Sequence, residues 1–219
     1  RYSTVANVRG VLLRADGSLL DLGFVMRAKH FRVTFDGSSY VFLANGYTSS
    51  WQRWTEQGTR ATVALVPDLD DKIITDLELA WDGSALMAVW LEDEIVDLKF
   101  LMRVHAREFR RNFQPNGPEL TIASEDASLD VTEHLALGSR PGQWLALWRE
   151  YRGSPDWRVH ASPIYGPSIA SFDGVTPLQL SWNGTAWELL DRYGVGLLDP
   201  NGRAIGYHRL LDQAEVEAM

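Results

Sequence analysis

Acidic residues gather in three irregular stretches of the chain, between segments that have a regular apolar pattern. They are Asp68, Asp70, Asp71, Asp76, Glu92, Asp93, Glu94, Asp97, Glu125, Asp126 and Asp130. If these carboxylates converge, their oxygens suit a hard cation such as Ca²⁺ or attract a basic partner. Asp68, Asp70 and Asp71 are the candidate metal ligands, although their run lacks the spacing and glycine of an EF-hand. The alternative is a solvated set of charges that keeps the protein soluble.

Two carboxylates also suit the hydrolysis of a glycosidic bond. That reaction needs a carboxyl group on each side of the bond, about 5 to 9.5 Å apart. Asp76 and Glu133 stand near the starts of two expected strands and are the pair that position favours. Every acidic protein offers such pairs, however, and no Asp-box of the sialidase kind is intact. A hydrolase is therefore an alternative interpretation.

Aromatic residues offer a second kind of site. Tyr47, Trp51 and Trp54 fall in and after a loop between apolar runs, and Trp157 occupies a comparable place. Flat rings in such loops stack on sugars or anchor a protein. Packing between sheets is the alternative for Trp51 and Trp54. Packing is also the prediction for the tryptophans that follow the alternating pattern, which are Trp81, Trp90, Trp148, Trp182 and Trp187.

Other chemistry has less support in the sequence. The five histidines show no close pair with metal-ligand spacing, so surface or core-edge roles are expected for His30, His105, His134, His160 and His208. No serine lies in a Gly-x-Ser-x-Gly elbow, and no glycine-rich phosphate loop joins a strand to a helix. The sequence thus predicts no cofactor other than Ca²⁺ at the aspartates named above.

The elements that position these residues are expected to be β-hairpins. An alternating apolar run, a turn and an aromatic-rich apolar run recur at 32–44, 78–90, 134–148 and 178–190. Asp-Gly or Asn-Gly in the turn is a strong hairpin signal, because both residues tolerate positive φ. Weaker hairpins lie between these, with turns at Asp16-Gly17, Asn116-Gly117 and Asn201-Gly202.

The spacing of the hairpins predicts a β-propeller. Asp36 and Asp82 are 46 residues apart, and Asp82 and Asn183 are 101 apart, which is two units of about 50 residues. We expect one all-β domain over 1–219, a propeller of four to five blades with four antiparallel strands each. The expected divisions are a partial blade at 1–30, blades at 31–76, 77–132, 133–177 and 178–210, and a short helix or tail at 211–219.

Composition narrows the class of partner. The 219 residues carry a formal net charge of -8, which opposes the phosphate backbone of a nucleic acid. No stretch approaches the roughly 20 apolar residues that span a bilayer, so membrane insertion is not expected. Cysteine is absent, which excludes disulfides. The chain starts with neither Met nor a signal peptide, which favours a mature or excised piece of a longer protein.

The hairpins resemble a known kind of repeat. Phe35–Phe42, Trp81–Trp90 and Arg14–Asp21 are similar to the propeller-type repeats of large secreted and surface proteins of bacteria. The resemblance covers most of the chain and implies a propeller in an extracellular or cell-surface protein. It departs from the pattern in the third unit and between Trp51 and Asp71. Such repeats occur in proteins of unrelated activity, so the resemblance implies no particular activity.

The propeller pattern also sorts the connections between strands. Tight turns lie on one face of a propeller, and the long loops lie on the other, around the mouth of the central channel. Loops carry function when a rigid scaffold presents them. The acidic, tryptophan-bearing loops therefore predict a non-catalytic module that binds a protein or a glycan. The alternatives are a glycoside-acting hydrolase with channel-mouth carboxylates and a purely structural domain of a larger assembly.

Overall fold

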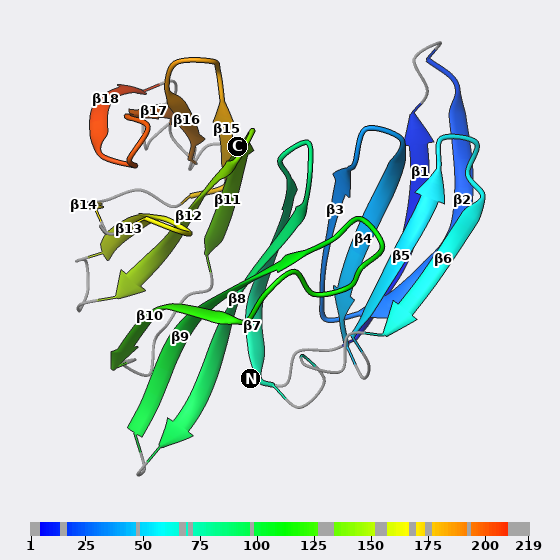
Figure 1. The fold of residues 1–219 in the computed structure, drawn as a ribbon, viewed down its shortest axis with the longest axis horizontal. Helices are drawn as coiled ribbons and strands as arrows, with labels where there is room; N and C mark the ends of the chain where they lie inside the picture. Colours follow the sequence, from blue (N-terminus) through cyan, green and yellow to red (C-terminus); the bar gives the residue numbers. More distant parts are fainter. Residues whose placement is uncertain are drawn as a thin grey trace, which may run out of the picture.

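The protein is a β-propeller built from antiparallel sheets (Figure 1). The computed structural model describes residues 5–13, 17–46, 49–65, 69, 72–96, 99–126, 134–151, 157–166, 170–173, 177–191 and 194–209. Within these ranges the chain forms one two-stranded sheet followed by four four-stranded sheets, which we call the N-terminal hairpin and blades 1 to 4. The described residues include no helix with the length and hydropathy needed to cross a membrane.

Each sheet uses strands that are consecutive in the chain. The N-terminal hairpin consists of β1 (Ala6–Leu13) and β2 (Leu19–Ala28). Blade 1 consists of β3 (His30–Phe35), β4 (Ser39–Asn45), β5 (Ser50–Thr55) and β6 (Arg60–Leu65). Blade 2 consists of β7 (Ile74–Trp81), β8 (Leu86–Val96), β9 (Lys99–Phe109) and β10 (Leu120–Asp126).

The last two blades repeat this order. Blade 3 consists of β11 (Leu135–Arg140), β12 (Gln143–Tyr151), β13 (Trp157–Pro163) and β14 (Ala170–Asp173). Blade 4 consists of β15 (Gln179–Trp182), β16 (Trp187–Leu190), β17 (Gly194–Leu198) and β18 (Ala204–Arg209). The first strands of successive blades contact one another, β3 with β7, β7 with β11 and β11 with β15, so we call them the inner strands.

The first turn of each blade forms for a local reason. Asp82 closes the turn of blade 2, because its Oδ1 accepts hydrogen bonds from the N–H groups of Ser84 and Ala85, both at 2.8 Å. Asp36 and Asn183 accept the matching pairs in blades 1 and 4. The glycine after each of these residues has a positive φ, between 85° and 103°, which other residues adopt only with strain. All four predicted hairpins are therefore present, with a shorter Pro-Gly turn in blade 3.

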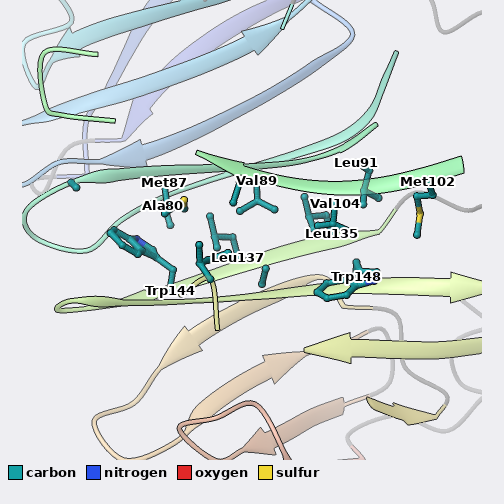
Figure 2. Close-up of a cluster of buried hydrophobic side chains, with 14 residues drawn as sticks. Ala80, Met87, Val89, Leu91, Met102, Val104, Leu135, Leu137, Trp144 and Trp148 are labelled. Carbon is teal, nitrogen blue, oxygen red and sulfur yellow. The ribbon is translucent and has the colours of Figure 1, made fainter. Parts of the chain in front are cut away.

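The core consists of apolar layers between neighbouring sheets. Figure 2 shows the layer between blades 2 and 3, where Met87, Val89 and Leu91 face Trp144 and Trp148. Similar layers join blade 1 to blade 2 and blade 3 to blade 4. Three tryptophans with the predicted packing role, Trp90, Trp148 and Trp187, are almost fully buried, and Trp81 and Trp182 are half-buried against the same layers.

The N-terminal hairpin extends this stack by one further layer. Val8, Val25 and Met26 pack against Phe42 and Trp54 of blade 1. The opposite face of the hairpin is exposed and carries several large apolar side chains, which are Val11, Leu13, Leu19 and Phe24. The predicted C-terminal helix or tail at 211–219 lies outside the described residues.

Candidate functional site

Equivalent residues of all four blades meet at one end of the channel. His30, Asp76 and Pro177 each lie five positions before the last residue of an inner strand, namely Phe35, Trp81 and Trp182. In blade 3 the matching position is His134, because Leu135 pairs with Trp148 as Leu77 pairs with Trp90. These four residues line an open hollow of about 290 Å³, which we call the channel mouth.

Asp76 connects three blades at the channel mouth. Its Oδ1 accepts hydrogen bonds from Leu77 N–H, at 2.8 Å, and from Nη2 of Arg32 in blade 1, at 3.0 Å. Its Oδ2 accepts a hydrogen bond from the N–H of Leu135 in blade 3, at 2.9 Å. Both oxygens are thus occupied, so this carboxylate orders the site rather than offering itself to a ligand.

Arg32 is shared between two carboxylates. Its Nε donates to Oε1 of Glu78 at 2.6 Å, while Nη2 donates to Asp76. Burial raises the pKa of Glu78 to about 7, although Arg32 opposes this rise. Glu78 therefore exchanges a proton near neutral pH, and its negative charge is present in full only above that range.

The two histidines at the channel mouth favour their neutral forms. Burial lowers the pKa of His30 below its usual value, and Arg32 and Lys29 add to this effect while Asp76 opposes it. Burial also lowers the pKa of His134, with a further contribution from Arg149. Acidification from pH 8 thus first neutralises Glu78 and then charges the imidazoles, so the channel mouth becomes more positive at each step.

The structure describes one of the two predicted catalytic carboxylates, Asp76, but not the other, Glu133. Asp76 lies at the channel mouth as expected, but hydrogen bonds hold both of its oxygens. Glu133 lies outside the described residues, as do Tyr47 and the proposed metal ligands Asp68, Asp70 and Asp71. For Trp157 the structure describes the backbone, which pairs with Tyr151 at the start of β13.

The expected ligand-stacking role of Trp51 and Trp54 is wrong, because both rings are buried. Trp51 is 1% exposed and stacks on Phe113, with ring centroids 5.2 Å apart. Trp54 is 7% exposed, packs against the N-terminal hairpin and donates its Nε1–H to Gln52 at 3.1 Å. Packing between sheets, the alternative interpretation, is the one that the structure confirms for these two residues.

Sequence reasoning missed Arg32 and Glu78 as site residues. They occupy the same position in consecutive repeats, each three residues before the end of its strand. Because equivalent residues of neighbouring inner strands lie side by side, opposite charges at this position were the available signal for an ion pair. His30 and His134 carried a similar signal, since they hold equivalent positions in two of the repeats.

A second polar cluster lies within blade 2. Lys72 donates to Glu119 at 2.8 Å and pairs with Glu92 at 3.1 Å, while the ring of His105 lies within 3.2 Å of both carboxylates. Burial lowers the pKa of His105, and Lys72 adds to this effect. The ligand atoms of Glu92, His105 and Glu119 lie within 4.8 Å of one another, a spacing that suits a metal ion. The ammonium of Lys72 already supplies a cation to both carboxylates.

The histidine of this cluster belongs to a repeated pair. Arg103–Ala106 and Arg158–Ala161 have the same four-residue sequence, Arg-Val-His-Ala. In each, the histidine stacks on a tryptophan of the neighbouring strand, His105 on Trp90 and His160 on Trp148. This exact repeat in the sequence was a signal for two equivalent strands.

Comparisons with known proteins show similarity to solved structures. No family model matches the chain, and no curated protein matches it. The chain is similar to the beta-propeller domain of the Trilobed protease from Pyrococcus furiosus, with 12% identity and a TM-score of 0.46 over 90% of this chain and 60% of that one. It is also similar to a mutant of Synechocystis apocarotenoid oxygenase, with 11% identity and a TM-score of 0.47 over 95% and 57%. The chain therefore spans 57 to 60% of these two structures.

Proposed function

We propose that this chain is a non-catalytic binding module whose channel mouth takes an anionic group of a protein partner. One observation carries the proposal. Residues at equivalent positions near the starts of the four inner strands converge on an open hollow that is also lined by Lys29, an exposed cation. A rigid scaffold that presents unlike side chains at equivalent positions is a common basis for binding sites.

The charges of the channel mouth favour an anion. Asp76 and Glu78 already share the guanidinium of Arg32, so their negative charges are compensated within the protein. Lys29, His30, Thr75 and His134 are the other polar residues of the lining. Since an anion beside the imidazoles favours their protonated forms, its binding is expected to draw protons into the site.

The same geometry favours binding over glycoside hydrolysis. A hydrolase needs one carboxyl group as acid and a second as base or nucleophile, on opposite sides of the bond. Here the two described carboxylates contact the same guanidinium, and each oxygen of Asp76 already accepts a hydrogen bond. Of the two described carboxylates that line the hollow, Glu78 has the raised pKa of an acid catalyst, and Asp76 already accepts hydrogen bonds on both of its oxygens.

A protein partner suits this site better than a glycan does. Two of the four rings expected to stack on sugars at this face, Trp51 and Trp54, are buried. An acidic side chain of a protein is small enough to enter a hollow of about 290 Å³. The resemblance to repeats of secreted and surface proteins supports an exported or surface-associated parent protein, where such modules bind other proteins.

Peptides of matched length test the proposal. Hexaglutamate and hexaglutamine are titrated into the protein at pH 6 and pH 8 by isothermal titration calorimetry. We expect hexaglutamate alone to bind, about tenfold more tightly at pH 6, because the site gains positive charge. Lys29→Gln weakens this binding, whereas His208→Ala in β18, away from the channel mouth, leaves it unchanged. Equal affinities for the two peptides would contradict the proposal.

A further inference from the structure

A second hollow lies at the other end of the inner strands, among the tight turns. It has a volume of about 490 Å³. Three turns of blades 3 and 4 line it, with the residues Gly142, Gln143, Trp144, Pro163, Tyr165, Gly166, Asn201 and Arg203. We call it the turn-face hollow. Because the channel mouth lies at the starts of these strands, the two hollows are on opposite faces of the propeller.

Tyr165 presents an aromatic ring that is held in place. The side chain is 61% exposed, yet its hydroxyl donates a hydrogen bond to Oε2 of Glu108 at 2.8 Å. The ring also meets Trp144 edge to face, with centroids 5.9 Å apart. A ring fixed at both ends loses little freedom when a ligand stacks on it. The free face of such a ring attracts polarised C–H groups, since its quadrupole is negative there.

Trp144 contributes a flat apolar ring to the wall of the hollow. The residue is 4% exposed, and its Nε1–H has no hydrogen-bond partner in the part of the chain that the structure describes. A buried donor without an acceptor costs about 1 to 3 kcal/mol. Because this nitrogen is itself buried, Trp144 lines the hollow with its ring rather than with its donor.

The rim of the hollow provides planar polar groups. Asn201 and Arg203 are exposed at the turn between β17 and β18. An amide both donates and accepts, as a sugar hydroxyl does, and a guanidinium suits a carboxylate. Among the described residues, Arg203 makes no ion pair and is the only charged residue that lines the hollow. The rim therefore favours a ligand with hydroxyl groups and one negative charge.

We infer that the turn-face hollow binds a saccharide that carries a carboxylate. The ring of the sugar lies on Tyr165, its hydroxyls meet the amide of Asn201, and its carboxylate meets Arg203. A saccharide satisfies all three features together, because it combines a C–H face, hydroxyls on its edge and an acidic substituent. This site is independent of the channel mouth, and neither proposal rests on the other.

Two families of oligosaccharide test this inference, oligomers of galacturonic acid and of galactose. Both are presented to the protein on an array, and the strongest binder is then titrated by calorimetry. We expect the acidic oligomers to bind, and Tyr165→Ala to weaken them at least tenfold. Arg203→Gln should remove the preference for acidic over neutral oligomers. The matched control is Tyr207→Ala, since Tyr207 is also exposed and also donates to a carboxylate, that of Asp191 at 3.0 Å, but lies outside the hollow.

Three results would overturn the inference. The first is an absence of binding by galacturonic acid oligomers at millimolar concentration. The second is a Tyr165→Ala variant that binds as tightly as the wild type. The third is a Tyr207→Ala variant that loses as much affinity as Tyr165→Ala. Thermal unfolding of each variant checks that the substitutions leave the fold intact, which is expected because both tyrosines are exposed.

Discussion

The two ends of the inner strands differ in how closely the blades repeat. At the turn end, Asp36, Asp82 and Asn183 make the same pair of hydrogen bonds in three blades. At the channel mouth, one equivalent position holds two histidines, an aspartate and a proline in the four blades. The repeated end builds the scaffold, and the varied end creates a site with unlike chemistry.

Asp76 and Asp82, which lie near the two ends of β7, differ in the same way. Oδ1 of Asp82 accepts three hydrogen bonds from its own turn, and its Oδ2 accepts one from the N–H of Gly142 in blade 3, at 3.3 Å. Asp76 connects blades 1, 2 and 3 and lies beside a group that titrates near neutral pH. The position of a carboxylate within the repeat thus decides whether it serves the turn or the site.

Removal of the Asp76 carboxylate should give the largest loss of stability. Asp76→Ala leaves the N–H of Leu135 without its acceptor and Arg32 with one carboxylate instead of two. We expect the free energy of unfolding to fall by about 3 to 4 kcal/mol, measured by urea denaturation. Asp21→Asn is the control, since its pair with Arg9 is solvent-exposed and is expected to contribute under about 1 kcal/mol. Equal losses of stability in the two variants would show that Asp76 contributes no more than an exposed ion pair does.

Glu78 should make the stability of the protein depend on pH. Its folded pKa of about 7 lies above the value of 4.5 for an unperturbed glutamate, so the folded state binds the proton more tightly than the unfolded state. The resulting stability is complete below pH 4.5 and is lost as the pH rises through 7. We expect a loss of about 3 kcal/mol that Glu78→Gln abolishes, measured by denaturation at pH 5 and pH 8. Parallel pH profiles for the variant and the wild type would contradict this assignment.

Removal of the Asp82 carboxylate should have a smaller effect that is confined to stability. Asp82→Ala leaves two N–H groups of the turn without their acceptor and is expected to lower the free energy of unfolding by about 2 kcal/mol. Because Asp82 lies at the repeated end, hexaglutamate should bind the variant as tightly as the wild type at pH 6. A loss of peptide affinity, with the fold intact, would show that the two ends are not separate in function.

The turn of blade 4 should show the smallest effect. Asn183 makes the same turn contacts as Asp82 but is exposed, so water can replace them. We expect Asn183→Ala to lower the free energy of unfolding by about 1 kcal/mol, measured by urea denaturation. A loss larger than that of Asp82→Ala would mean that burial does not set the strength of these turns.

Much of the fold could be predicted from the sequence because its signals are local. An Asx-Gly turn between alternating apolar runs needs only neighbouring residues to form, and the four hairpins follow from it. The pairing of Arg32 with Glu78 depends instead on the register between blades, which no single hairpin specifies. The ion pair at the channel mouth therefore could not be predicted until the arrangement of the inner strands in space was known.

The error over Trp51 and Trp54 has a physical reason. Trp51 and Trp54 are three positions apart in β5, so the regular alternation of a strand places their rings on opposite faces of blade 1 and in different layers. Trp51 faces blade 2, and Trp54 faces the N-terminal hairpin. Blade 1 is covered on both faces, so residues on either side of the strand are buried. The sequence shows an irregular pattern, which is also typical of a loop.

Proton uptake on binding tests the central claim most directly. Hexaglutamate is titrated into the protein at pH 7 in two buffers that differ in their ionisation enthalpy, and the difference in heat gives the number of protons bound. If the anion lies beside Glu78, His30 and His134, the complex takes up protons, and His30→Ala reduces their number. Binding without any proton uptake, or uptake that His30→Ala leaves unchanged, would contradict the channel mouth as the anion site.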